Sequence, residues 1–524
     1  MATGFLLSGP DMLDRPLTPK GQVKKKTKTV DSVPYVTQYS YDMNGNLKTI
    51  TEPSGEVITN NYSNDKAVSV LKGAANLATS INYKPFGGIS SLSYGNGIAG
   101  SISYDNQYRI TGITAGSAMS LSYPTYDANG NITAINNVLD ATKNKSFSYD
   151  TLDRLSTATA NGLWGSLSWT YDGVGNRQTE NATAYSYTPN TNKLNTVGGT
   201  SYGFDSNGNT TSQGARQYTY NQNQRLVQVV DGAMTATYTY DGNGQRVKKV
   251  VNGVATIFHY DEGGQLIAES NGSGAITAVY VYLNGQPLAK IEGSSVYYYH
   301  NDALGTPQKM TDASGTIVWA ADYKPFGEVT ITVSTITNNL GFPGQYRDAE
   351  TGLIYNMNRV YNPATGRYDE ADPLLLPFFY QGRTYFVPPY YTKTPSKLHD
   401  YLYAASNPVN LIDPSGLQTS GGTGTCQPDT CQAQADAAYN NCMTQMRQGP
   451  QRMSTTICVI RAVGAGVVAG AVTRNPVIGG IIGTGLTIVC FTIPQGIEDP
   501  ALRSAETYCG MLRRRFYEAC EASR

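Results

Sequence analysis

Two aspartates that each precede a proline could take part in acid–base chemistry: Asp372 in the sequence ADP and Asp413 in the sequence IDPSGL. Two carboxylates that are forced together cannot both ionise, so one can keep its proton and act as an acid while the other activates a water molecule. An Asp-Pro pair is also a common start of a turn. From these residues alone, the turn is the favoured interpretation.

The cysteines could form disulfides, and all seven of them lie in the last 99 residues, while residues 1–425 contain none. Two pairs are each eleven residues apart within a predicted helix, and eleven residues at about 100° each return to nearly the same helix face. If the two helices pack antiparallel, the predicted disulfides between them are Cys431–Cys520 and Cys442–Cys509. A third predicted disulfide, Cys458–Cys490, lies between these in the sequence, and Cys426 is left over. Reduced thiols packed in a core are the alternative, and the connectivity is a geometric preference only.

The C-terminal part of the chain lacks the sequence features of nuclease, protease, metal and phosphate-binding sites. All three histidines (His259, His300 and His399) precede it, which excludes His-dependent nuclease and Cys–His protease chemistry there. Its acidic residues have no metal-ligand spacing, and no glycine-rich phosphate loop ending in Lys follows a strand. We therefore expect no cofactor and no metal, and a conventional enzyme hidden in the tail is the interpretation that ranks last.

The composition predicts a β-rich chain with no strong electrostatic partner. Lys plus Arg and Asp plus Glu both number 39, so no net field would steer the chain to nucleic acid, and we expect no nucleic-acid partner. Charged residues are only 15%, whereas there are 55 glycines and 39 tyrosines. This balance is typical of strands and turns rather than helices.

A repeat of about twenty residues must position these side chains. Each copy has a Thr/Ser/Tyr-rich strand, a Tyr-Asp pair, a Gly/Asn turn, and then Arg, Leu, Ile or Val. Copies begin at Tyr41, Tyr104, Tyr126, Tyr149, Tyr171, Phe204, Tyr220, Tyr240 and Tyr260. Asn-Gly pairs supply the positive φ of hairpin turns, and the aspartate can accept hydrogen bonds from turn N–H groups. Consecutive hairpins predict a continuous antiparallel sheet, in which packing is favoured over sugar binding as the role of the tyrosines.

These copies resemble the YD repeats of RHS proteins, teneurins and insecticidal toxin-complex C subunits. The resemblance implies a mainly β fold in which a spiralling antiparallel YD-repeat sheet forms a hollow shell. From Tyr297 the chain also resembles an RHS core, in the stretches YYYHNDALGTPQKMTDASGTIVWAADYKPFGEV, FPGQYRDAETGLIYNMNRVYNPATGRYDEADP and SNPVNLIDPSGL. Family members with this ending resemble aspartyl proteases that cut themselves.

The resemblance assigns the site residue by residue. Asp413 and Asp372 would be the catalytic carboxylates, and Arg359, thirteen residues before Asp372, would orient one of them. The predicted scissile bond joins Leu417 to Gln418. Asp413 follows Asp372 by 41 positions, which is longer than the family pattern. If the extra residues 374–399 separate the two aspartates, cleavage would be lost.

The C-terminal part has a different character. After a Gly/Thr/Ser-rich linker, residues 429–524 are expected to form a small α-helical domain with a Gly-rich apolar hairpin. Each apolar run is near 15 residues, which is marginal for spanning a bilayer. GxxxG pairs would let two helices touch closely. A buried hairpin is one interpretation, and membrane insertion by residues 457–493 is the one we favour.

The expected organisation combines these parts. Residues 1–34 would be an N-terminal segment, incomplete if the chain is a fragment, followed by a YD-repeat shell (35–296), an RHS core (297–417), a linker (418–428) and a Cys-rich cargo (429–524). The predicted function is an RHS-type polymorphic toxin that releases its C-terminal effector by cutting itself after Leu417. The resemblance implies an immunity protein and a delivery machine as partners.

Without an apolar run for a signal peptide, we expect secretion or surface display by another route. A non-cleaving structural or adhesive YD-repeat protein is the alternative.

Overall fold

The computed structural model of the chain describes residues 16–85, 87–373, 375, 378–380, 383–385, 399–417, 419–421, 455–462 and 486–493. The chain divides into two compact units, residues 1–423 and residues 424–524. Among the helices of the described stretches, none combines the length and the apolar character that crossing a bilayer requires.

A sheet of 31 strands makes up most of the described part of the first unit. Each strand pairs antiparallel with the next one in the chain, as β1–β2 and β22–β23 do, so the sheet is a long series of hairpins. The mainly β, antiparallel fold expected from the sequence is confirmed. The sheet runs from Lys25 to Ser334, and therefore has strands on both sides of the repeat region 35–296.

The first strands of the sheet are β1 Lys25–Val30, β2 Val33–Tyr41, β3 Leu47–Thr51, β4 Val57–Ser63, β5 Lys66–Lys72, β6 Ala75–Tyr83, β7 Ile89–Tyr94, β8 Ala99–Tyr104, β9 Ile110–Ala115, β10 Met119–Tyr126, β11 Ile132–Asn137, β12 Lys145–Tyr149, β13 Leu155–Ala160, β14 Gly165–Tyr171, β15 Arg177–Glu180 and β16 Thr183–Tyr187. The sheet continues with β17 Leu194–Val197, β18 Thr200–Phe204, β19 Thr210–Gln213, β20 Arg216–Tyr220, β21 Leu226–Asp231, β22 Met234–Tyr240, β23 Arg246–Val251, β24 Val254–Tyr260, β25 Leu266–Asn271, β26 Ile276–Leu283, β27 Gln286–Glu292, β28 Ser295–Asn301, β29 Pro307–Thr311, β30 Ile317–Tyr323 and β31 Val329–Ser334. A 3₁₀ helix, η1 (Ala141–Lys143), lies between β11 and β12.

The two residues of the Tyr-Asp pair have separate roles in the repeat that begins at Tyr126. In the turn after β10, Oδ1 of Asp127 accepts the N–H groups of Asn129 and Asn131, at 2.9 and 2.8 Å. The preceding Tyr126 donates its hydroxyl to the carbonyl oxygen of Ile110 in the repeat before. The aspartate therefore closes its own turn, while the tyrosine ties its hairpin to the previous one.

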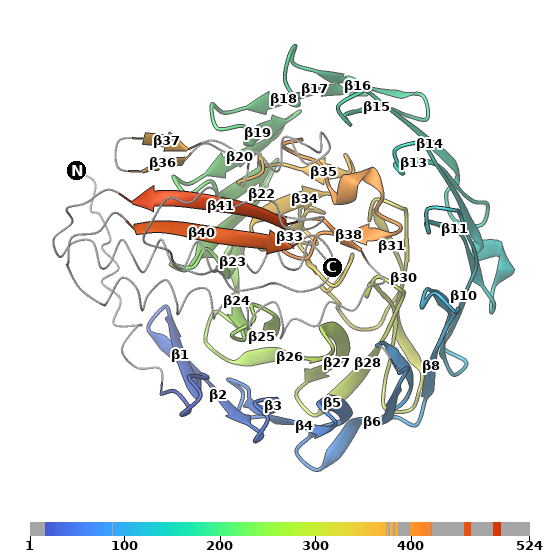
Figure 1. Ribbon diagram of the computed structural model, residues 1–524, viewed down its shortest axis with the longest axis vertical. Helices are drawn as coiled ribbons and strands as arrows, with labels where there is room; N and C mark the ends of the chain where they lie inside the picture. The colour runs from blue at the N-terminus through green and yellow to red at the C-terminus, as the bar shows by residue number, and fades with distance from the viewer. Residues whose placement is uncertain are drawn as a thin grey trace. The chain divides into compact units, whose positions relative to one another are not determined.

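Strands far apart in the sequence lie side by side in the first unit, because the sheet curves back on itself (Figure 1). Lys28 on β1 forms an ion pair of 3.0 Å with Asp241, which lies 213 residues later. The ring of Tyr35 on β2 is 4.2 Å from that of His259 on β24. We call this contact between β1–β8 and β22–β30 the seam.

The candidate core residues 340–372 and 399–417 form smaller elements that pack against the large sheet. Their strands are β32 Tyr346–Arg347, β33 Ile354–Asn356, β34 Arg359–Asn362 and β35 Arg367–Tyr368, which make a four-stranded sheet, then the 3₁₀ helix η4 Ala404–Ser406 and β38 Leu411–Ile412, which pairs with β39 Ser420–Gly421. Nδ2 of Asn410 donates to the hydroxyl of Tyr149, and Arg246 on β23 pairs with Asp348. The core elements thus contact both early and late repeats.

Two strands lie within the extra residues 374–399. They are β36 (Phe378–Tyr380) and β37 (Arg383–Tyr385), which pair antiparallel. The other residues of this stretch, apart from Leu375 and His399, lie outside the described residues. The two strands therefore form a short antiparallel hairpin.

The second unit contains a pair of antiparallel strands, β40 (Thr455–Ala462) and β41 (Leu486–Ile493). Helices were expected where these residues form strands, and the glycines of the expected GxxxG pairs lie outside the described residues. Both strands are rich in Ile, Val and Thr, whose branched side chains favour a pleated surface over a helix. The helical periodicity that we expected cannot be distinguished from a strand in apolar runs this short. The two flanking predicted helices lie outside the described residues.

Candidate active site

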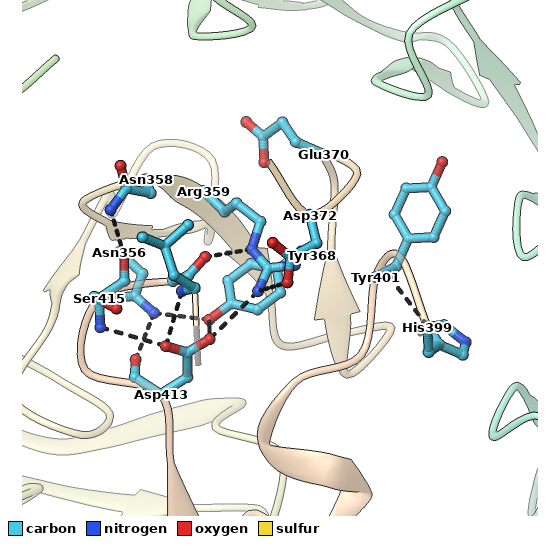
Figure 2. Close-up of polar contacts among 12 residues, drawn as sticks. Asn356, Asn358, Arg359, Tyr368, Glu370, Asp372, His399, Tyr401, Asp413 and Ser415 are labelled. Atoms are coloured by element: carbon cyan, nitrogen blue, oxygen red, sulfur yellow. Dashed lines mark hydrogen bonds and ion pairs between the residues drawn. The ribbon is translucent and has the colours of Figure 1, made fainter. Parts of the chain in front are cut away.

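Three short elements position the side chains around Arg359. This residue begins β34, and the sheet register places it opposite Asn356, the last residue of β33. Tyr368 ends β35, where it pairs with Tyr361 of β34. Asp413 follows β38 directly. The ends of β33, β34 and β35 and the residue that follows β38 therefore meet around Arg359, as Figure 2 shows.

Arg359 bridges the two aspartates that the sequence singled out. Its Nη2 atom lies 3.2 Å from Oδ2 of Asp372 and 3.4 Å from Oδ2 of Asp413 (Figure 2). Its Nε donates to the carbonyl oxygen of Gly416, which precedes Leu417. The side chain is 2% exposed. Burial alone would lower the pKa of Arg359, but the neighbouring carboxylates, Asp372 first, raise it above the ordinary value, so the guanidinium is charged.

The long spacing between the two aspartates does not separate them. The backbone N–H of Asp372 donates to the carbonyl oxygen of Asp400 at 2.8 Å, so the backbone at Asp400 lies beside the backbone at Asp372. Nη1 of Arg359 donates to the same carbonyl at 3.2 Å. Asp372 and Asp400, which flank residues 374–399, therefore meet at the site.

Asp413 is buried and accepts hydrogen bonds at both carboxylate oxygens. Oδ1 accepts the N–H groups of Ser415, at 3.3 Å, and Leu417, at 3.0 Å. Oδ2 accepts the hydroxyl of Tyr368 at 2.8 Å and the guanidinium of Arg359 at 3.4 Å. All four partners are donors, which suits an ionised carboxylate because that form only accepts.

The turn at Asp413 is built like the turns of the repeats. In both, Oδ1 accepts the N–H groups two and four residues later, and the third residue after the aspartate has positive φ; it is Gly416 here and Gly130 after Asp127, but Tyr108 after Asp105 and Asp153 after Asp150. Oδ2 differs. In six repeat turns it accepts the side chain four residues later: Asp42–Asn46, Asp105–Arg109, Asp127–Asn131, Asp150–Arg154, Asp172–Asn176 and Asp205–Asn209. In the Asp413 turn that position is Leu417, which has no polar group. Oδ2 of Asp413 points instead towards Tyr368 and Arg359.

Gly416 is required by the close approach of this turn to β33 and β34. Its φ is +72°, and an added Cβ would lie 2.5 Å from the carbonyl oxygen of Asn356 and 3.1 Å from the nitrogen of Arg359. No side chain fits there without movement of backbone. The glycine lets the Gly416–Leu417 peptide lie next to Arg359, whose Nε donates to the Gly416 carbonyl oxygen.

Two polar residues of the site were missed by the sequence analysis. Tyr368 binds Asp413, and Nδ2 of Asn356 donates both to the Tyr368 hydroxyl, at 2.8 Å, and to the carbonyl oxygen of Asp413, at 2.7 Å. Alignment of the Asp413 turn with the repeat turns could have indicated that Oδ2 lacked its usual partner. It could not have indicated which side chain replaces that partner.

Two further acids adjoin the site without contacting the scissile segment. Burial raises the pKa of Asp369 to about 7 and that of Glu370 to about 8. Oε2 of Glu370 accepts the backbone N–H of Val360 at 2.8 Å. Glu370 therefore favours its protonated form at neutral pH, while Asp369 is divided between its two forms.

The other predicted site residues are not part of the cluster around Arg359. Gln418, on the far side of the predicted scissile bond, lies outside the described residues, as do Cys431, Cys442, Cys509 and Cys520. Cys458 and Cys490 are directly opposite in the register of β40 and β41. Opposed residues of antiparallel strands are about 4.5–5.5 Å apart at Cα, which is within the range of a disulfide. That disulfide stays a prediction.

Among the described residues, no group of three or more His, Cys, Asp or Glu side chains is arranged to hold a metal ion.

Known proteins resemble this chain in its repeat and core regions. A family model described as "Teneurin YD-shell" matches residues 122–409, more than half of the chain. Double-stranded DNA deaminase toxin A of Burkholderia cenocepacia is 34% identical over 137 residues, which are 25% of this chain and 8% of that protein. Toxin protein Tse5 of Pseudomonas aeruginosa is 30% identical over 138 residues, 25% of this chain and 9% of that protein. The tRNA3(Ser)-specific nuclease WapA of Bacillus spizizenii is 30% identical over 155 residues, 29% of this chain and 6% of that protein.

Solved structures share the fold. The crystal structure of TcdB2-TccC3-Cdc42 superposes with a TM-score of 0.61 at 20% identity, over 76% of this chain and 23% of that one. The Tc holotoxin pore of Photorhabdus luminescens gives a TM-score of 0.62 at 19% identity, over 76% and 23% of the two chains. In each comparison the chain spans less than a quarter of the protein that it matches.

Proposed function

Because the chain belongs to the teneurin YD-shell family, we propose that it is an RHS-type polymorphic toxin that cuts itself after Leu417 and so releases residues 418–524 as an effector. Three of its relatives are described as toxins or nucleases, and all three match it over about a quarter of its length. What those relatives act on belongs to their own effector regions and is not carried over to this chain.

One observation carries the proposal: a buried, charged Arg359 contacts both Asp372 and Asp413 while holding the carbonyl oxygen of Gly416. This arrangement puts two carboxylates and a cation beside the turn that ends at Leu417. Fixed charges in a dry site act more strongly than in water and need no reorganisation during the reaction.

In the proposed reaction, a water molecule adds to the carbonyl carbon of Leu417 and the bond to the nitrogen of Gln418 breaks. We assign the base to Asp413, because its contacts are those of an ionised carboxylate. Asp372 would protonate the departing amine, since its side chain is 13% exposed and can regain a proton from solvent. Asp372 therefore starts the reaction protonated, and Arg359 balances the single negative charge that passes from Asp413 to Asp372 as the two protons are transferred.

Intact-mass spectrometry of the purified full chain tests this proposal. We expect two species, residues 1–417 and residues 418–524, and a single uncut chain for Asp413→Asn and for Asp372→Asn. Asp205→Asn is the matched control, because Asp205 closes a repeat turn with the same pattern of N–H groups but does not touch Arg359. An uncut wild-type chain would rule out self-cleavage.

The pairing of β38 with β39 favours the second candidate, a non-cleaving structural or adhesive protein. Leu411 and Ile412 pair with Gly421 and Ser420, so residues on both sides of the bond after Leu417 belong to one small sheet. A chain that stays whole after prolonged incubation, with all variants alike, would support this candidate.

A membrane-acting effector is a second part of the proposal. It rests on the apolar residues 457–493, part of which form the paired strands β40 and β41. The test is dye release from liposomes by the wild-type preparation and by uncut Asp413→Asn. We expect release from the cleaved preparation alone, and no release from either one would remove this part of the proposal.

We also propose that the protein acts outside the cell that makes it, delivered by a secretion machine and accompanied by an immunity protein. Support comes from the toxin relatives and from the likeness to the holotoxin pore structure. Co-purification of a small neighbouring gene product with residues 418–524 would support the immunity partner, and failure of that product to protect cells that express the chain would remove it.

A further inference from the structure

The contacts of Asp413 implicate a residue that the family resemblance does not assign. We propose that Tyr368 is a positioning residue, whose hydroxyl holds Oδ2 of Asp413 in the orientation that cleavage requires. This inference rests on the proposed self-cleavage, and deepens it by naming what orients the base.

A short chain of hydrogen bonds leads to the carboxylate. Nδ2 of Asn356 donates to the Tyr368 oxygen at 2.8 Å, and the Tyr368 hydroxyl donates to Oδ2 of Asp413 at 2.8 Å. Because the Asn356 amide already donates to the tyrosine oxygen, the hydroxyl proton is directed towards the aspartate. Tyr368 is 1% exposed, so water does not compete for either bond. Both hydrogen bonds lie in a buried, low-dielectric environment, where such bonds are stronger than in water.

The hydroxyl keeps its proton under all relevant conditions. Burial, followed by the negative charge of Asp413, raises the pKa of Tyr368 well above its ordinary value. Tyr368 is therefore a permanent donor and not an acid or base in the reaction. Its effect on cleavage is exerted through Asp413.

The comparison with the repeat turns explains why Asp413 needs this partner. In six repeats the side chain four residues on fixes Oδ2, as Asn131 fixes that of Asp127. Leu417 at that position has an apolar side chain, so it cannot hold Oδ2 as Asn131 does. Tyr368 supplies a donor from β35 and so holds Oδ2 of Asp413 beside Arg359, while Oδ1 binds the N–H groups of Ser415 and Leu417.

The same side chain also orients the cation. The guanidinium of Arg359 lies over the Tyr368 ring, with 3.7 Å between its central carbon and the ring centroid. A Tyr368→Phe substitution keeps this stacking and removes only the hydroxyl. It therefore separates the hydrogen bond to Asp413 from the packing of Arg359.

The test follows cleavage of the full chain made by pulse-labelled cell-free synthesis and chased in buffers from pH 5 to pH 9. We expect Tyr368→Phe to cleave about ten-fold more slowly than wild type, because a hydrogen bond to a charged group is lost. The acid limb of its pH–rate profile should move to higher pH, because the hydrogen bonds that a carboxylate accepts stabilise its ionised form. Asn356→Ala should shift the same limb by a smaller amount.

Tyr361→Phe is the matched control, because Tyr361 is equally buried and its hydroxyl donates to the backbone of Phe326, away from both acids. A wild-type rate and acid limb in Tyr368→Phe would overturn the inference while leaving self-cleavage intact. Equal slowing in both phenylalanine variants without movement of the limb would also overturn it, since that result indicates a general loss of packing. An uncut wild-type chain would instead remove the proposed function itself.

Discussion

Gly416 is the single residue whose backbone most directly limits the geometry of the proposed site. Alanine there would place its Cβ 2.5 Å from the Asn356 carbonyl oxygen, so the turn must move away from Arg359. A displacement of about 1 Å can cost 100-fold in rate. We predict that Gly416→Ala slows cleavage at least about 100-fold, measured by the fragment time course.

Gly55→Ala is the control for Gly416→Ala. Gly55 also has positive φ, at +85°, but no atom lies within 4 Å of an added Cβ. It therefore has the backbone strain of the test variant without the clash. Equal cleavage by the two alanine variants would contradict the role given to Gly416.

Glu370 provides a second residue-scale prediction, which concerns stability. Burial raises its pKa from 4.5 to about 8, so the unfolded chain releases this proton at lower pH than the folded chain. Folding stability from this group is full below pH 4.5 and falls as the pH rises towards about 8. We predict that Glu370→Gln, which keeps the acceptor for Val360, raises the unfolding midpoint at pH 8.5 and not at pH 4. A constant difference at both pH values would contradict the shift.

Motifs in the sequence predicted part of this residue-scale picture. Arg359, Asp372 and Asp413 were chosen by likeness to a family pattern, and they do lie within contact of one another. Tyr368 could not be chosen, because its role depends on β35 ending opposite a turn that lies 45 residues further along the chain. Spacing in the sequence contains no information about that approach.

Individual elements are held to the large sheet by buried charges, most clearly where β23 meets the segment before β33. Arg246 makes two hydrogen bonds to Asp348, at 2.6 and 3.0 Å, and Lys249 adds a third at 3.0 Å. Removal of Asp348 would leave two buried cations without this partner. We predict that Asp348→Ala lowers the free energy of unfolding by about 3–5 kcal/mol in urea titration.

Asp231→Ala is the control for the Asp348 variant. Asp231 also pairs with an arginine, Arg216, but its side chain is 40% exposed. Exposed pairs contribute no more than about 1 kcal/mol, so this variant should remain close to wild type. Similar losses of unfolding free energy in both variants would show that the burial of an ion pair does not determine its contribution to stability.

At the scale of elements, the hairpins were predictable because their signal is local. Asn-Gly and Gly-Asn pairs mark each turn, and a two-residue alternation marks strands such as β22. The residues of β40 and β41 were expected to be helical, since short apolar runs have no decisive period. Pairing between these strands, which are 24 residues apart, decided the structure there.

The whole first unit depends on the seam, which the sequence does not reveal. Lys28 and Asp241, or Tyr35 and His259, belong to repeats with no local relation to each other. Their contact arises only from the accumulated curvature of more than twenty strands between them. Hairpins alone predict a sheet, and it is the side-chain pairs across the seam that hold one part of that sheet against another.

Two histidines at the seam make the whole unit sensitive to acid. His259 packs on Tyr35, and His300 packs on Tyr94 of β7 at 4.9 Å. Burial, with a nearby lysine in each case, lowers the pKa of His259 to about 3 and that of His300 to about 4. The unfolded histidines take up protons below about pH 6.5, whereas the folded ones do not. Stability is therefore full above that pH and falls as the pH drops towards 4.

We predict that the double variant His259→Gln/His300→Gln loses less stability than wild type between pH 7.5 and pH 5, as measured by the thermal unfolding midpoint. Glutamine can still bond Ser270 and Thr311, the present partners of the two rings. The midpoint at pH 7.5 gives the cost of the substitutions themselves, because both histidines are neutral there. Only the change from that value reports proton uptake. If the unfolding midpoints of wild type and variant fall in parallel, the buried histidines do not cause the acid sensitivity. The ion pairs of the seam, such as Lys28 with Asp241, are then the contacts to test.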